Sequence, residues 1–288
     1  MKLQGIYVPL VTPFTTDDQI DYPVLEQLAE VMIAKGVAGI VAFGTTGEYY
    51  SFSAEERNEV LQRIAAVAKG RVQLVVGIND LSTANSIEHA KTAQKYGYEA
   101  LMLAAPPYSL PTQEGVIRHF EKVANEQDLP IIMYNYPDRI GVGLDFETVN
   151  HLRQHPKIIG IKESSGDFNF ALQMLQAQWP DFEVMCGSDG WAADFFFWGS
   201  HSWISGAANV FPEEHVALAK AALEGDWDTA RAQMQTMYAG IRSMELSDYN
   251  QKAKLGIQRF GLNAGSVRMP LVDMDAESQT AFLDLLPT

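Results

Sequence analysis

The chain has 288 residues, 47% of them hydrophobic, and a formal net charge of −15 at pH 7. This length suits one α/β barrel with extra helices, and the hydrophobic content is sufficient for a large core. The acidic balance argues against nucleic acid and anionic membrane surfaces as partners, because both require clustered lysines and arginines.

The sequence predicts a cytoplasmic protein. A single cysteine, Cys186, allows no internal disulfide and fits a reducing compartment. The segment Met1–Gly5 lacks the apolar stretch of a signal peptide. No apolar run approaches the roughly 20 residues that a membrane span needs.

Short apolar runs rich in β-branched residues alternate with segments of helical periodicity. The predicted strands are Gly5–Val11, Gly39–Ala42, Gln73–Gly77, Ala100–Leu103, Ile131–Tyr134, Ile158–Ile161, Val184–Cys186 and Trp203–Ser205. The predicted helices are Tyr22–Lys35, Ala54–Lys69, Thr83–Tyr96, Gln113–Asn125, Phe146–Arg153, Phe168–Gln178, Trp191–Trp198 and Glu213–Leu223. This alternation predicts parallel strands with crossover helices, and eight such units predict an α/β fold, a closed (β/α)8 TIM barrel over residues 1–224.

The strand pattern stops after about residue 225. Three further helices are predicted at Asp226–Met244, Tyr249–Phe260 and Ala276–Leu286. Residues 225–288 are therefore interpreted as a C-terminal helical extension of the same domain. It could cover the barrel or build an oligomer interface, and the sequence leaves both open.

Helix-end signals support several of these elements. Ser53 followed three residues later by Glu56 has the spacing of a capping box. Gly36, Gly70 and Gly97 each follow a predicted helix, where a left-handed cap is expected.

Lys162 and Tyr134 are the principal candidates for chemistry. In a barrel of this kind the active site lies at the carboxyl ends of the strands and in the loops that follow. Lys162 directly follows the predicted strand Ile158–Ile161, and Tyr134 ends the strand before it. A buried amine has a lowered pKa and can attack a ketone to form a Schiff base, and a phenol beside it can relay protons. A structural ion pair for Lys162 and an ordinary barrel aromatic at Tyr134 are the alternatives.

The loop Gly44–Glu48, after the second strand, is a second candidate. Its glycines expose backbone N–H groups, and Thr45 and Thr46 add hydroxyls, a combination that can hold a carboxylate or phosphate. A simple tight turn would use the same glycines. Arg139, after the fifth strand, could bind a substrate carboxylate with its planar fork or be a surface arginine.

Other classes of site find little support. The six histidines do not gather at strand ends, which disfavours a histidine-based nucleophile system. His151 and His155 have a metal-binding spacing but fall on a predicted outer helix, so no metal site is predicted. No phosphate-binding or dinucleotide-binding fingerprint is present.

The chain resembles the dihydrodipicolinate synthase / N-acetylneuraminate lyase family, from Gly5 to about Pro270. The segments that carry the resemblance are Gly44–Glu48, Tyr134–Pro137 and Ile159–Glu163, spaced on the second, fifth and sixth strands. The family consists of (β/α)8 class I lyases that activate pyruvate through a lysine Schiff base, without a metal or a cofactor.

The resemblance implies roles for the catalytic candidates. Lys162 would be the Schiff-base lysine. Tyr134 and Thr45 would relay protons, and Tyr108 would complete the relay from a neighbouring subunit. The protein would then be a homo-oligomer, and the family's usual assembly implies a homotetramer.

The resemblance also implies a substrate-binding set. Thr46 and the N–H groups of the loop that contains Gly47 would hold the pyruvate carboxylate. Arg139 would meet the carboxylate of the second substrate, and Gly187 and Ile204 would line the pyruvate pocket.

Two departures from the synthase pattern bear on substrate and regulation. Ser247–Lys252 lacks the proline-rich motif that is common in synthases. The positions of the lysine-feedback site are replaced, so the sequence predicts no inhibition by lysine. The replacing residues are Tyr49, Ala54, Arg57, Leu81, Asn85 and Pro107.

The resulting hypothesis is a pyruvate-dependent class I lyase most similar to 4-hydroxy-tetrahydrodipicolinate synthase, which joins pyruvate to aspartate semialdehyde. The retained Arg139 favours this member. An aldolase or dehydratase of 2-keto-3-deoxy sugar acids is the alternative within the class. A barrel that binds a keto acid without turnover is the alternative outside it. A phosphate-handling barrel is disfavoured because the loops after the seventh and eighth strands lack a basic residue.

Overall fold

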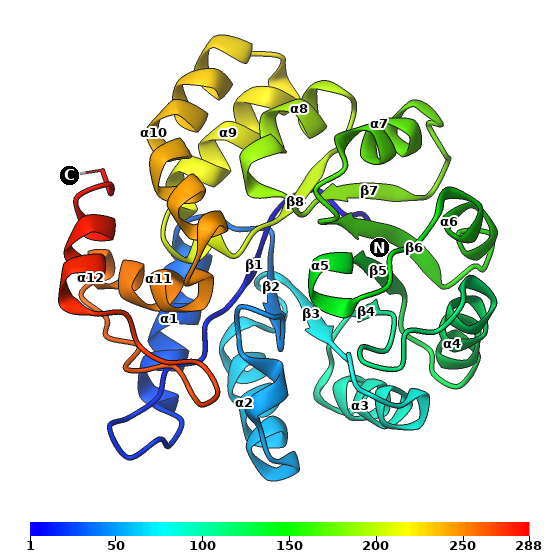
Figure 1. Ribbon diagram of the computed structural model, residues 1–288, viewed down its shortest axis with the longest axis horizontal. Helices are drawn as coiled ribbons and strands as arrows, with labels where there is room; N and C mark the ends of the chain where they lie inside the picture. The colour runs from blue at the N-terminus through cyan, green and yellow to red at the C-terminus, as the bar shows by residue number, and fades with distance from the viewer. Residues whose placement is uncertain (288) are drawn as a thin grey trace.

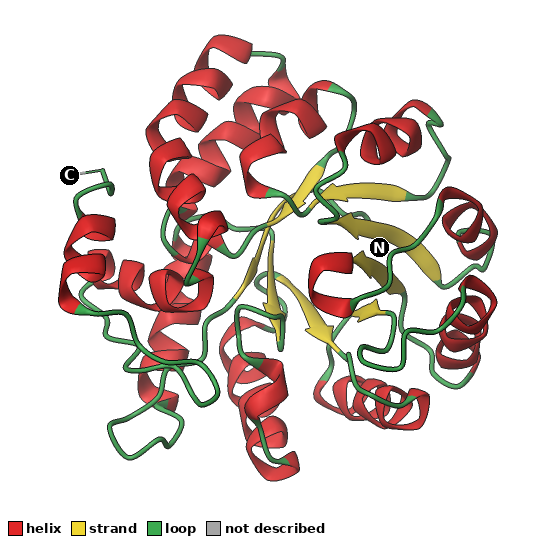
Figure 2. Cartoon of the chain, in the orientation of Figure 1, coloured by secondary structure: helices red, strands yellow, loops and turns green. Residues whose placement is uncertain are grey.

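Eight parallel strands close into a barrel in the computed structural model, which describes residues 1–287. Each strand is hydrogen-bonded to the next in sequence, and β8 closes on β1. The strands are β1 Gly5–Pro9, β2 Gly39–Ala42, β3 Gln73–Gly77, β4 Ala100–Ala104, β5 Ile131–Asn135, β6 Ile158–Glu163, β7 Glu183–Cys186 and β8 Ser202–Ile204. Figures 1 and 2 show the strands at the centre and the helices around them. The predicted α/β barrel is confirmed.

Helices separate the strands and form the outer layer, except for the short α5 Pro137–Ile140, which lies over the barrel mouth. They are α1 Tyr22–Ala34, α2 Ala54–Ala68, α3 Thr83–Tyr96, α4 Gln113–Asn125, α5 Pro137–Ile140, α6 Phe146–Leu152, α7 Phe168–Gln176, α8 Ala192–Phe197 and α9 Pro212–Glu224. Strands β2, β4 and β5 are buried along their whole length, as expected for parallel strands covered on both faces. In α4 the buried residues Val116, Phe120 and Val123 recur at helical spacing and face the barrel.

The predicted helix ends are present. The Ser53 side chain accepts a hydrogen bond from the Glu56 N–H, and the Glu56 side chain accepts one from the Ser53 N–H, forming the capping box of α2. Gly97 ends α3 with φ of 83°, and its N–H donates to the carbonyls of Ala93 and Gln94. Glycine suits this position because the left-handed conformation is strained for other residues.

The sixth strand is longer than predicted, and this places Lys162 inside it. Tyr134 of β5 pairs with Lys162 of β6, which in turn pairs with Met185 of β7. Glu163 continues the ladder to Cys186. The apolar run ends at Ile161, but the backbone pairing continues for two more residues because both neighbouring strands reach that far. The short helix α5, which carries Arg139, was not predicted.

The C-terminal extension consists of α10 Trp227–Leu246, α11 Tyr249–Gly256 and α12 Ala276–Leu283. Figure 1 shows these helices gathered beside β8, β1 and α1. The predicted second helix is divided, since Ile257–Phe260 forms a separate 3-10 turn. Helix α11 contacts the barrel mouth: Lys254 pairs with Glu48 at 2.7 Å, and the Asn250 amide donates to the Thr45 carbonyl at 3.1 Å. No helix within residues 1–287 has the length and apolarity of a bilayer span.

Candidate active site

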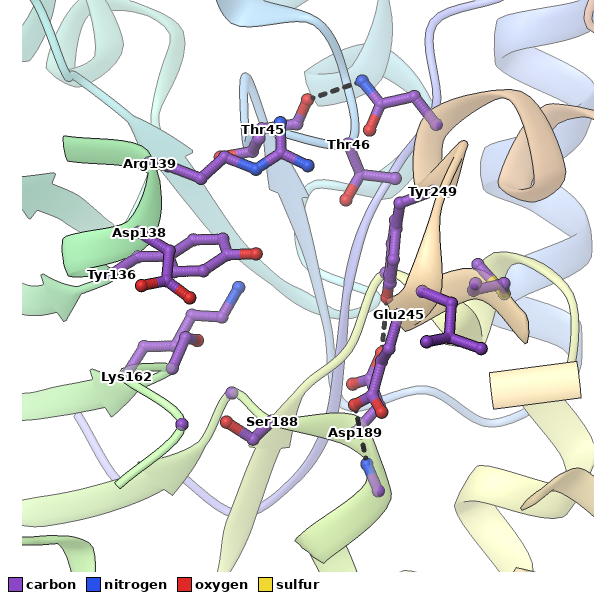
Figure 3. Close-up of a pocket in the computed structure, with 18 of the residues that line it drawn as sticks. Thr45, Thr46, Tyr136, Asp138, Arg139, Lys162, Ser188, Asp189, Glu245 and Tyr249 are labelled. Carbon is purple, nitrogen blue, oxygen red and sulfur yellow. Dashed lines mark hydrogen bonds between the residues drawn. The ribbon is translucent and has the colours of Figure 1, made fainter. Parts of the chain in front are cut away.

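A cavity of about 470 Å³ opens at the carboxyl ends of the strands. Figure 3 shows the Lys162 amine pointing into it, with Tyr136, Asp138 and Arg139 on one side and Tyr249, Glu245 and Asp189 on the other. Of the predicted site residues, the following line this cavity: Thr45, Thr46, Tyr134, Arg139, Lys162 and Gly187. The loops that follow β2, β5, β6 and β7 thus supply groups to one space, together with α10 and α11.

Lys162 is buried but unpaired. Only 7% of the residue is exposed, and no carboxylate in residues 1–287 lies within 4.0 Å of its amine. Burial lowers the pKa of Lys162 to about 8, while the negative charge of Asp189 opposes this shift. About a tenth of the amine is therefore neutral at pH 7, far more than for an ordinary lysine, and this neutral form is the nucleophile that addition to a ketone requires.

Tyr134 lies directly beside this amine. The Lys162 nitrogen is 4.4 Å from the centre of the Tyr134 ring, because the two residues are paired across β5 and β6. Burial raises the pKa of Tyr134 to about 12, and the hydroxyls of Thr45 and Ser164 and the charge of Arg139 oppose part of the rise. The phenol therefore keeps its proton at neutral pH and can donate it to, or pass it between, reacting groups.

The loop after β2 presents two free backbone donors. The N–H groups of Gly47 and Glu48 are used inside the turn, where they donate to the carbonyls of Gly44 and Thr45. Neither the Thr45 nor the Thr46 N–H donates to any other residue that the structure describes. Unpaired N–H groups at a buried site favour an anion, so this loop can hold a carboxylate.

Two glycines are required by close approaches at this site. A Cβ on Gly187 would lie 2.8 Å from the Lys162 Cγ and 2.7 Å from the Glu163 carbonyl oxygen, so any other residue would obstruct the lysine side chain. A Cβ on Gly47 would lie 2.7 Å from the Leu10 carbonyl oxygen. Gly47 itself does not line the cavity, and neither does Ile204, which is fully buried in β8.

Tyr108 is not part of this cavity. It is 92% exposed on the loop after β4, with φ of 69°. A smaller cavity of about 210 Å³ adjoins the first and shares Thr45 and Tyr134 with it. Arg139 lines both cavities, with its guanidinium carbon 5.8 Å from the centre of the Tyr136 ring.

Sequence reasoning assigned no role to two residues of the cavity wall, Asp189 and Tyr249. Asp189 is buried at 4% exposure and accepts hydrogen bonds from the Trp203 indole N–H, at 2.9 Å, and from the Tyr249 hydroxyl. Its place after the seventh strand was a usable signal. Tyr249 gave none, because it lies 60 positions further along the chain and reaches the cavity only through the packing of α11.

Comparison with known proteins assigns the family. A match to the dihydrodipicolinate synthetase family covers residues 2–288. The chain belongs to this family. It is therefore a class I lyase, of a family whose enzymes use a lysine Schiff base and no cofactor.

Individual relatives resemble the chain along its whole length. It is 37% identical over 286 residues to the 4-hydroxy-tetrahydrodipicolinate synthase of Exiguobacterium sibiricum, covering 99% of this chain and 96% of the relative. The solved structure of the same enzyme from Methylacidiphilum fumariolicum SolV is 34% identical with a TM-score of 0.93, over 99% of this chain and 96% of that one. The dihydrodipicolinate synthase of Acinetobacter baumannii, solved with pyruvate, is 31% identical with a TM-score of 0.95, over 99% and 98% of the two chains.

Proposed function

We propose that this family member is a pyruvate-dependent lyase in which Lys162 forms the Schiff base, and that its reaction is the condensation of pyruvate with aspartate semialdehyde. One observation supports the first part. The Lys162 amine is buried, has no carboxylate partner within 4.0 Å among residues 1–287, lies 4.4 Å from the centre of the Tyr134 ring and faces the cavity. The second part is supported by relatives that are named 4-hydroxy-tetrahydrodipicolinate synthase and by Arg139 at the cavity wall.

The chemistry begins at the neutral amine. Lys162 adds to the ketone carbon of pyruvate, and the resulting carbinolamine loses water to give an iminium. Tyr134 donates the proton that allows hydroxide to leave as water. The iminium withdraws electrons, so the adjacent methyl group loses a proton and an enamine forms. The enamine carbon then attacks the aldehyde carbon, and hydrolysis of the new iminium releases the product and the free amine.

The loop after β2 orients the keto acid. The free N–H groups of Thr45 and Thr46, together with the Thr46 hydroxyl, would hold the pyruvate carboxylate. Thr45 also lies close enough to Tyr134 to lower its pKa, which supports a place for Thr45 in the proton relay.

Tyr108 would act on another subunit. Its exposure of 92% removes it from its own cavity, while the smaller cavity beside Thr45 and Tyr134 leaves space for an inserted side chain. We propose that Tyr108 of a second copy occupies this space, which requires at least a dimer and fits a homotetramer.

A second acceptor class is favoured by one feature of the cavity. Beyond Lys162, its wall continues through Ser188, Glu245 and Ser247, a row of groups that suits the hydroxyls of a sugar acid. Cleavage or dehydration of a 2-keto-3-deoxy sugar acid would use the same Lys162 iminium.

Two measurements test these proposals. Borohydride reduction in the presence of pyruvate should add the mass of the reduced adduct to the peptide that contains Lys162, whichever acceptor is used. If no adduct forms at Lys162, the Schiff-base proposal is wrong. Turnover of aspartate semialdehyde, compared with a panel of keto-deoxy sugar acids, then separates the acceptors. If the enzyme forms the adduct in the trapping experiment but turns over only the sugar acids, the condensation is rejected and the alternative is supported.

A further inference from the structure

Asp189 is the buried carboxylate of the cavity. The other carboxylates that line it are Asp138 and Asp248, on exposed residues, and Glu245, whose side chain is 27% exposed and accepts a hydrogen bond from the Gly190 N–H. Water screens charges at exposed positions far more than charges at buried ones. Asp189 and Lys162 influence each other directly: the carboxylate charge raises the pKa of Lys162, and the lysine charge lowers the pKa of Asp189.

Two side chains fix this carboxylate in place. The indole N–H of Trp203, a residue with 0% exposure, donates to one oxygen at 2.9 Å. The Tyr249 hydroxyl donates to the other. Burial raises the pKa of Asp189, and these two donors, with Ser205, oppose the rise. The two donors therefore favour the charged form in a place where burial alone would neutralise it.

Tyr249, which donates to Asp189, is itself fixed by close packing. A Cβ on Gly206 would lie 2.5 Å from the Tyr249 ring and 2.6 Å from the Thr46 hydroxyl oxygen, so the three residues are packed against one another. The neighbouring Asn250 donates to the Thr45 carbonyl, and Lys254 pairs with Glu48. Helix α11 is thus anchored on the loop after β2 at the same time as it reaches Asp189 (Figure 3).

We propose that Asp189 is the fixed countercharge for the cation that forms at Lys162, and that Tyr249 is a positioning residue that acts through Asp189. The inference rests on the proposed Schiff-base function. The iminium carries a positive charge on a residue that is only 7% exposed, and a carboxylate that is already oriented stabilises it without reorganising. This charge exists at the stage between loss of water and loss of the methyl proton.

The other titratable and charged groups around Lys162 do not supply this charge. Burial raises the pKa of the Cys186 thiol and of the Tyr134 and Tyr249 phenols, so none of them is an anion at neutral pH. Tyr136 is a further phenol. Asp138, Arg139, Arg242 and Asp248 are charges on exposed residues. The Glu245 side chain is 27% exposed, and burial raises the pKa of its carboxyl. Glu163 is buried but does not line the cavity, and its carboxylate accepts hydrogen bonds from the Asn135 amide and the Ser165 N–H.

The test is the pH dependence of pyruvate binding by the full chain, measured by calorimetric titration at pH 6 and pH 9. At pH 9 the free amine is mostly neutral, so binding creates a new cation and Asp189→Asn should weaken it. At pH 6 the amine is already a cation, and the loss of Asp189 affects free and bound states alike. We expect the ratio of half-saturation concentrations, pH 9 over pH 6, to rise about tenfold in Asp189→Asn, equivalent to a shift of about one pKa unit.

Tyr249→Phe should raise the same ratio less, by about two- to threefold, because the carboxylate keeps its indole donor. Tyr98→Phe is the matched control, since Tyr98 is a buried phenol whose hydroxyl donates to the Leu61 carbonyl; its ratio should equal that of the wild type. Should Asp189→Asn fail to fold, Tyr249→Phe carries the test.

An unchanged ratio in either folded variant overturns the inference, and so does equal weakening at both pH values, which is what a merely structural role would produce. Borohydride reduction of the wild type in the presence of pyruvate distinguishes failure of the countercharge inference from failure of the proposed Schiff-base function. An adduct on Lys162 with an unchanged ratio rejects only the countercharge. Absence of an adduct on Lys162 rejects the proposed function and the inference together.

Discussion

Two of the buried lysines, Lys162 and Lys254, lie at the same end of the barrel, and their surroundings differ. Lys254 of α11 is 3% exposed, lies 2.7 Å from a Glu48 oxygen and donates to the Ser266 carbonyl. Lys162 of β6 is 7% exposed and faces a cavity. Burial lowers the pKa of both amines, but at Lys254 the charge of Glu48 opposes the shift from 2.7 Å. Burial alone therefore does not make a nucleophile: the amine also needs open space and no partner.

The largest expected effect separates the two by activity. Lys162→Met should remove pyruvate trapping and lower turnover by roughly 10³-fold or more, since Lys162 is the lysine that lines the cavity. Lys254→Met should keep trapping in the folded fraction, because its amine is enclosed by Glu48 and Ser266. The measurement is borohydride adduct formation by mass spectrometry, and an adduct in Lys162→Met would assign the chemistry to a different lysine.

The second expected effect is a loss of stability when Lys254 is replaced. Lys254→Met leaves Glu48, which is 0% exposed, as an uncompensated buried charge, and we expect a loss of about 3–5 kcal/mol in the free energy of unfolding. Urea titration measures it. The double variant Lys254→Met/Glu48→Gln removes the orphaned charge and should recover part of the loss. If the double variant is no better than the single one, the cost arises from packing rather than from charge.

The contrast also shows what the sequence could and could not predict. The barrel was predictable because β-branched apolar runs and helical periodicity alternate, and the end of the run at Ile161 misplaced the strand boundary by only two residues. Lys162 and Tyr134 could be found because strand ends in such a barrel converge. The partner of Lys254 could not, because Glu48 lies 206 positions earlier in a loop. The link from Tyr249 to Asp189 was missed for the same reason, since it depends on where α11 packs.

The third expected effect is a gain in stability: Lys162→Met should raise the free energy of unfolding, whereas Lys254→Met should lower it. Lys162 has a folded pKa of about 8, below its ordinary value of 10.5. Below pH 8 both the folded and the unfolded chain bind this proton, and the fold carries the full cost of the buried charge. Between pH 8 and 10.5 only the unfolded chain holds it, so that cost declines as pH rises. Lys162→Met should therefore raise the free energy of unfolding at pH 6 by up to about 3 kcal/mol.

This gain should shrink through the window from pH 8 to 10.5 and vanish above it. Urea titrations of wild type and variant at pH 6, 9 and 10.5 provide the check. A gain that stays constant with pH would mean that methionine improves packing and that the charge of Lys162 costs nothing.

The smallest effect concerns the rate of imine formation in the wild type. Only the neutral amine attacks the ketone, so the rate constant with pyruvate, followed by rapid borohydride quenching, should rise about tenfold per pH unit below the pKa. It should level off above a midpoint of about 8. Tyr98→Phe serves as the control, because Tyr98 is a buried phenol that does not line the cavity and its loss should leave this midpoint in place. A midpoint near 10.5, the ordinary value for lysine, would show that the amine is solvated in solution, and the distinction between the two buried lysines would then lose its basis.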